Sequence, residues 1–101
     1  MTTKKIKYGI NEFEKDFGPL TFADMLESHR TCDEISQKDL AQKLGISQSS
    51  LCDLEKGRKI PSPKRAAQIA KALGYPPELW VLTALQDQVN EAGIKLKLAA
   101  A

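Results

Sequence analysis

The sequence predicts an all-α protein in which five helices enclose one small core. Serine or threonine residues that can cap a helix recur just before stretches with apolar residues at helical spacing. Glycine or proline follows these stretches, where a helix would end. With 101 residues, the chain is long enough for one domain with short arms.

Residues 1–19 are predicted to form an arm ahead of the core. Lysines make residues 1–9 basic, and apolar residues alternate weakly there, so a short strand is one prediction. Residues 11–17 fit a short acidic amphipathic helix that Asn11 caps and Gly18-Pro19 ends. Its apolar residues, Phe13 and Phe17, favour a small satellite core over a docking site for another protein.

The next two predicted helices begin with capping boxes. Thr21 caps the first of them and Ser36 caps the second, each with an aspartate three residues further on. The second helix ends at Gly45, where the chain needs a left-handed conformation that only glycine adopts cheaply. The sequence therefore predicts a tight turn at Gly45 between two short helices.

The helix after this turn carries a polar face sized to enter a DNA groove. Ser47 is its predicted cap and Gly57 its predicted end, while Leu51 and Leu54 point inward. A helix in the major groove reads bases from its first turns, and glutamine can both donate to and accept from adenine. In preference to a merely solvated helix face, we predict base contacts by Gln48, Ser49, Ser50 and Asp53.

A basic stretch follows this helix. No acidic residue occurs from Lys56 to Lys71, although the stretch holds several lysines and arginines. Such a patch could be a solubilising surface, but beside a groove-reading helix it suits neutralisation of the DNA backbone. Helix starts also offer free amides to a phosphate. The predicted phosphate contacts are Gln37, Ser47, Lys56, Arg58, Lys59 and Lys64.

Two further helices complete the predicted core. Ser62 caps the fourth, which ends at Gly74, and Pro76-Pro77 opens the fifth, which reaches about Glu91. The apolar stripe of the fifth helix is wider than one small core can cover, and such a surface usually meets a partner. We predict a homodimer interface formed by Leu79, Trp80, Leu82, Leu85 and Val89.

The segment from residue 21 to residue 82 resembles the Cro/C1-type helix-turn-helix of the XRE family. The matching elements are Gln37, Leu40-Ala41, Gly45, Gln48-Ser49-Ser50, Leu54-Glu55 and Gly57. The resemblance implies a compact five-helix, lambda-repressor-like domain that binds an inverted-repeat operator in double-stranded DNA as a homodimer. It also implies phosphate contacts at Gln37, Lys56 and Arg58 and base contacts at Gln48, Ser49 and Asp53. The acid at Asp53 departs from the glutamine of some phage repressors, and it could accept from cytosine or repel a phosphate.

The whole chain is also similar to HigA-type antitoxins of bacterial toxin–antitoxin modules. The similarity rests on the acidic segment at residues 13–26, the run from Leu51 to Gly57, and the ending at residues 84–93. It implies a repressor that regulates its own operon and has a cognate toxin as a further partner. The alternative is a stand-alone XRE-type or phage-like repressor with no toxin partner.

Other classes of protein fit the sequence poorly. No glycine-rich phosphate loop, metal-ligand spacing or activated nucleophile appears, so we predict no enzyme activity, cofactor or metal. No apolar run could span a membrane and no signal peptide is evident, so the expected location is the prokaryotic cytoplasm. There Cys32 and Cys52 would be reduced thiols. The net charge is only +2, but an acidic flank at residues 12–34 precedes the basic stretch, which suits two different partners.

The predicted organisation has four parts along the chain. Residues 1–19 are the arm, residues 20–75 the helix-turn-helix domain, and residues 76–96 the dimerisation helix and its tail. Residues 97–101 are typical of sequence left by a cloning vector. The alternation of Ile94, Leu96 and Leu98 suggests a strand that would then be partly accidental.

Overall fold

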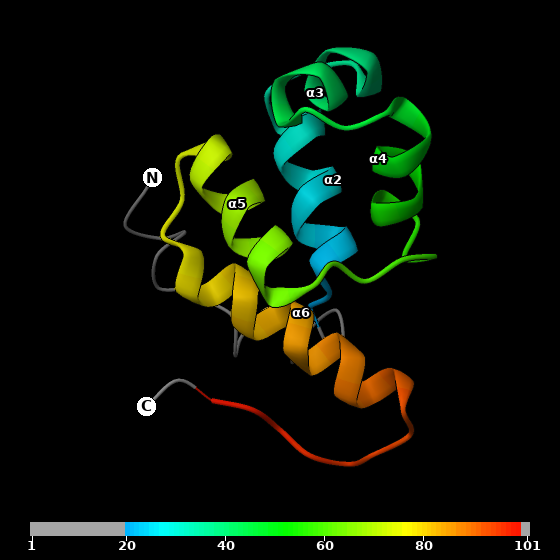
Figure 1. Cartoon of the computed structure of the whole chain (residues 1–101), viewed down its shortest axis with the longest axis vertical. Coiled ribbons are helices and arrows are strands. Elements are labelled where there is room, and N and C mark those ends of the chain that lie inside the picture. The colour runs from blue at the N-terminus through cyan, green and yellow to red at the C-terminus, as the bar shows by residue number, and fades with distance from the viewer. Residues whose placement is uncertain (1–19, 100–101) are drawn as a thin grey trace.

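Five helices follow one another in the computed structural model, which describes residues 20–99. They are α2 (Phe22–Cys32), α3 (Gln37–Leu44), α4 (Gln48–Glu55), α5 (Pro63–Leu73) and α6 (Pro77–Glu91). Figure 1 shows α2 in the middle of the molecule, with α3 at one end, α4 alongside it and α6 across the other end. This arrangement confirms the predicted all-α, five-helix fold. The strand and helix expected within residues 1–19 lie outside the described residues.

Side-chain hydroxyl groups begin the first four of these helices. Each accepts the backbone N–H of the residue three positions further on, and the caps are Thr21, Ser36, Ser47 and Ser62. The capping box at Thr21 is complete, because the Asp24 carboxylate also accepts the Thr21 N–H. At Ser36 only the serine half of the predicted box is formed. The predicted helix starts are therefore correct, and local hydrogen bonds fix them.

The core is made of apolar side chains from all five helices. Leu51 and Leu54, the predicted inward positions of α4, are buried. The whole buried apolar set is Phe22, Leu26, Leu40, Ala41, Leu51, Leu54, Ala66, Ile69, Ala70, Trp80 and Ala84. Helix α6 packs against α5 and against α2, which closes the core from below in Figure 1.

Trp80 belongs to this core and not to the outer surface of α6. Its side chain is only 4% exposed. The ring lies edge-on to Phe22, with 5.5 Å between ring centroids, and it stacks on Tyr75 at 5.2 Å. The prediction that Trp80 contributes to a dimer interface is therefore wrong, since a residue buried within the monomer is not available to a second subunit.

The chain after α6 forms neither helix nor strand over residues 94–99. The side chain of Gln86 holds it: the amide nitrogen donates to the Leu96 carbonyl at 2.7 Å, and the amide oxygen accepts the Leu98 N–H at 2.6 Å. The strand suggested by the alternation of Ile94, Leu96 and Leu98 is not formed, because a side chain and not a neighbouring strand provides the hydrogen bonds.

Asp87 joins α6 to α2. Its carboxylate accepts the backbone N–H of Phe22, the first residue of α2, at 2.8 Å. Burial raises the pKa of Asp87, and the nearby Asp24 adds to this effect, while the hydrogen bond from Phe22 opposes it. The raised pKa means that the folded state binds the Asp87 proton more tightly than the unfolded chain does.

The variant Asp87→Asn is expected to become more stable than the wild type as the pH rises. Below the ordinary aspartate pKa of about 3.9 both folded proteins carry a neutral group at this position, so their stabilities should be similar. As the pH rises through the raised pKa, the wild type alone must ionise a partly buried carboxyl group and loses stability. Urea denaturation from pH 3.5 to 7.5 measures this, with Asp39→Asn as the control for removing one exposed negative charge.

Candidate nucleic-acid interface

The turn between α3 and α4 has the geometry that the sequence predicts. Gly45 adopts a left-handed conformation, with φ of 71°. The Ile46 N–H returns to the Ala41 carbonyl at 3.0 Å, so the last turn of α3 is closed by the chain that leaves it. Because residues with a Cβ atom enter this conformation only at a cost, Gly45 fixes the direction in which α4 starts.

Helix α4 buries one face and exposes the opposite one. Leu51 is fully buried and Leu54 is 8% exposed. Gln48 and Ser49, in the first turn, are exposed. These two predicted base contacts therefore lie together at the start of a helix whose other face is anchored in the core.

Ser50 lies apart from this pair. It is half-buried, and its hydroxyl accepts from the Ser47 hydroxyl at 2.9 Å within the cap of α4. It lines a small groove of about 260 Å³ between α4 and the start of α5, together with Ile46 and Arg65. The structure thus turns Ser50 towards α5 and leaves Gln48 and Ser49 as the outward pair.

The structure also pairs Asp53 and Arg58, which were predicted to have separate roles as a base contact and a phosphate contact. The Arg58 Nε donates to the Asp53 Oδ1 at 2.8 Å, and its Nη2 donates to the Cys52 Sγ at 3.3 Å. The hydrogen bond to Asp53 raises the pKa of Arg58. Asp53 therefore does not stand alone as an unpaired acid on the face that would meet DNA.

The remaining predicted phosphate contacts surround the ends of α4. Ser47 is exposed at the start of the helix, and the basic side chains of Lys56, Lys59 and Lys64 are exposed after its end and in the first turn of α5. No acid lies between Lys56 and Lys64 in the chain, so this stretch carries charge of one sign.

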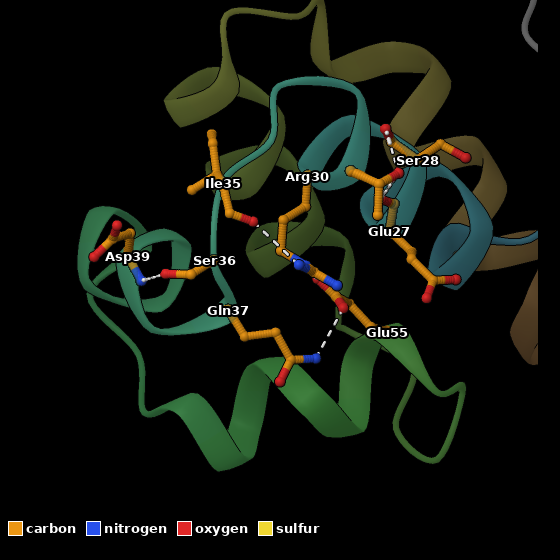
Figure 2. A network of polar contacts seen from close by, with 9 residues as sticks. Glu27, Ser28, Arg30, Ile35, Ser36, Gln37, Asp39 and Glu55 are labelled. Carbon is orange, nitrogen blue, oxygen red and sulfur yellow. Dashed lines mark hydrogen bonds and ion pairs between the residues drawn. The ribbon is translucent and has the colours of Figure 1, made fainter.

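A buried carboxylate behind this face links three helices, as Figure 2 shows. Glu55 of α4 is 5% exposed. It accepts from the Arg30 Nε at 2.7 Å and from the Gln37 Nε2 at 3.0 Å. Arg30 also donates through Nη1 to the Ile35 carbonyl at 3.1 Å. The network joins the end of α2, the start of α3 and the end of α4.

No role for Glu55 was predicted from the sequence. The available signal was its spacing, since Glu55 falls on the same helical face as Leu51 and next to Leu54. A charged residue at such a position must be paired, because an isolated buried charge is very costly. Gln37, the predicted phosphate contact at the start of α3, is oriented by one amide N–H donated to Glu55 and keeps a second N–H and its oxygen for other partners.

A second surface lies on the outer side of α6. Leu79 is 40% exposed, while Leu82, Leu85 and Val89 are half-buried. Two of them line an apolar groove of about 390 Å³ between α5 and α6, made of Ala67, Pro77, Glu78, Val81, Leu82 and Leu85. These are the predicted interface residues without Trp80.

Comparison with known proteins gives results that agree with this geometry. Residues 34–80 match the family model described as helix-turn-helix, HTH_3. An uncharacterized HTH-type transcriptional regulator of Methanocaldococcus jannaschii is 43% identical over 53 residues, which cover 52% of this chain and 80% of that protein. The ImmF control region 10 kDa protein of Bacillus phage phi105 is 33% identical over 68% of this chain and 74% of its own length. An endothelial differentiation-related factor 1 homolog of Gallus gallus is 31% identical over 71% of this chain and 49% of its own length.

The fold and the capped, exposed start of α4 define a helix-turn-helix DNA-binding domain. The chain belongs to the helix-turn-helix family of the Cro/C1 (XRE) type, whose members are transcriptional regulators. This family is not enzymatic, which agrees with the prediction from the sequence. Among residues 20–99, no helix combines the length and the apolar character that crossing a membrane requires.

Removing the Glu55 carboxylate is expected to destabilise the fold strongly. Glu55→Ala leaves the Arg30 guanidinium and the Gln37 amide without their shared acceptor, and breaking a buried ion pair by removing one partner costs about 3–5 kcal/mol. Arg30 keeps 18% side-chain exposure, so the lower end of this range is expected. Urea denaturation monitored by circular dichroism measures the loss, and Glu91→Ala serves as an exposed-acid control.

The double variant Arg30→Met/Glu55→Leu tests the cause of that loss. It should be less destabilised than the sum of its two single variants, because it leaves no unpaired charge behind. Additive losses would show that the two side chains do not depend on each other.

Proposed function

We propose that this protein is a sequence-specific transcriptional repressor that binds an inverted-repeat operator as a homodimer. The observation that carries the proposal is the exposure of Gln48 and Ser49 at the capped start of α4, on the side opposite to Leu51 and Leu54. A helix held in this way can enter the major groove with its first turn against the base edges.

The proposed contacts fall into two groups. Gln48 reads a base, with adenine as its best partner, and Ser49 adapts to the neighbouring base. The contacts that position the protein on the backbone are Gln37, Ser47, Lys56, Lys59 and Lys64. Figure 2 shows the Gln37 side chain extended from the start of α3 towards α4, where it donates to the Glu55 carboxylate.

The proposed dimer forms through the outer side of α6. Its exposed leucine and the adjoining apolar groove form an apolar surface of the kind that a symmetric dimer can bury. Two copies of α4 would then enter successive major grooves about 34 Å apart. A repressor of this kind acts by covering a promoter in the cytoplasm.

The function we propose is that of a regulator with no toxin partner. The name of the phage phi105 relative places that protein in a control region, which favours the phage-like repressor. Neutralisation of a toxin remains a prediction from the similarity to HigA, and none of the three relatives described above bears an antitoxin's name. A neighbouring gene for a small basic protein, and capture of its product by this chain, would support the antitoxin role.

Gln48→Ala is expected to weaken binding to the cognate operator by roughly 1–3 kcal/mol while changing the affinity for random DNA little. The reason is that Gln48 contributes hydrogen bonds to a base edge and no charge. Fluorescence anisotropy with an operator selected from a random library measures both affinities.

Gln68→Ala, an exposed glutamine on α5, is the matched control for this measurement. It should leave both affinities unchanged. Equal losses on operator and random DNA by Gln48→Ala would argue against base readout by α4.

Leu79→Glu is expected to weaken dimerisation by roughly tenfold or more, because it buries an unpaired charge at a cost of at least about 1.4 kcal/mol. Because the Leu79 side chain is exposed in the monomer, the fold should tolerate the change. Analytical ultracentrifugation measures the dissociation constant, and Ala72→Glu, an exposed position on α5, is the control. A wild type that stays monomeric both free and on the full operator would refute the dimer.

A further inference from the structure

The end of α4 places an arginine on the same face as the proposed base contacts. Leu51, Leu54 and Glu55 are buried, so Ser49 and Asp53, one turn apart, occupy the middle of the opposite face. Arg58 follows the helix in the chain, yet its guanidinium lies over Asp53 and Cys52.

Backbone geometry holds Arg58 in this position as well. Gly57 has φ of 77° and turns the chain back along the helix. The Gly57 N–H then bonds to the Leu54 carbonyl at 3.3 Å, and the Arg58 N–H bonds to the Asp53 carbonyl at 2.9 Å. This is the Schellman pattern of a helix end. In this pattern the two residues at the positions of Asp53 and Arg58 usually make an apolar contact with each other. Here an ion pair takes the place of that contact.

We propose that Asp53 and Arg58 act together to read a guanine, with Arg58 as the base contact and Asp53 as its positioning residue. The inference rests on the proposed binding of α4 in the major groove. It changes the role of Arg58 from a contact to the DNA backbone into a determinant of sequence specificity.

The hydrogen bonds of Arg58 leave the right donors for this task. A guanidinium has five N–H groups. One, on Nε, is used by Asp53, and one on Nη2 is used by Cys52, which leaves both hydrogens of Nη1 and one of Nη2. The outer edge of the guanidinium therefore keeps two parallel donors, and the side chain is 58% exposed. Two parallel donors match the O6 and N7 acceptors of guanine in the major groove.

The charge of the pair favours a base over a phosphate. Asp53 and Arg58 together carry no net charge, so the pair gains little from neutralising the DNA backbone. A phosphate brought to Arg58 would also approach the Asp53 carboxylate, and like charges at close range repel. The neutral edge of guanine carries no such penalty.

Selection of binding sites from a random DNA library tests the inference. The wild type should select guanine at one position of each half-site, and Arg58→Ala should lower that preference roughly 5- to 150-fold while leaving the other positions unchanged. Asp53→Ala should reduce the same preference by a smaller factor and raise affinity for random DNA, because it removes a negative charge.

Two further variants complete the experiment. Arg58→Lys keeps the charge but loses the planar pair of donors, so it should also reduce the guanine preference without changing the salt dependence. Arg65→Ala, an exposed arginine on α5, is the control and should leave the selected sequence unchanged. Thermal unfolding checks that each variant is folded.

Several outcomes would overturn the inference. A uniform loss of affinity in Arg58→Ala, with a salt slope lowered by about one, would make Arg58 a phosphate contact. An unchanged guanine preference in Asp53→Ala would remove the positioning role. Failure of the wild type to select any sequence would instead count against the proposed function itself, whereas a selected site that depends on Gln48 and not on Arg58 would overturn this inference alone.

Discussion

The buried carboxylate of Glu55 is the constraint on which the orientation of α4 depends. Arg30 of α2 and Gln37 of α3 both donate hydrogen bonds to it. A carboxylate in this position is stabilising only while both partners remain, since an unpaired buried charge costs several kcal/mol. The three helices must therefore keep one relative arrangement. In that arrangement Leu51, Leu54 and Glu55 face inward and the opposite side of α4 faces outward.

The sequence was sufficient to predict the helices because local interactions define their limits. A hydroxyl cap and its N–H partner lie three residues apart, and a left-handed glycine closes the turn that precedes it. Interactions over such short separations leave a visible pattern in the chain. The same holds for the exposed start of α4, which follows from the positions of Ser47, Leu51 and Leu54 alone.

Interactions between distant residues could not be predicted in this way. Arg30 and Glu55 lie 25 positions apart, and Phe22 and Asp87 lie 65 apart, so no periodic pattern relates them. Trp80 shows a second limit. Helix α6 carries apolar residues on more than one side, and spacing alone does not tell which of them face the core. The tail at residues 94–99 shows a third, because alternation predicts a strand only where another strand can pair with it.

The two surfaces used in the proposed function can act at the same time because different helices carry them. Helix α6 packs against α5 and α2, whereas α4 packs against α2 and α3, so a subunit that covers the outer side of α6 need not cover α4. Figure 1 shows α6 across one end of α2 and α4 alongside α2. Since α4 is fixed within each subunit by Glu55 and by its caps, the dimer contact alone would set the separation of the two reading helices. The readout of bases and the spacing of half-sites would therefore depend on separate residues of this chain, and each could change without the other.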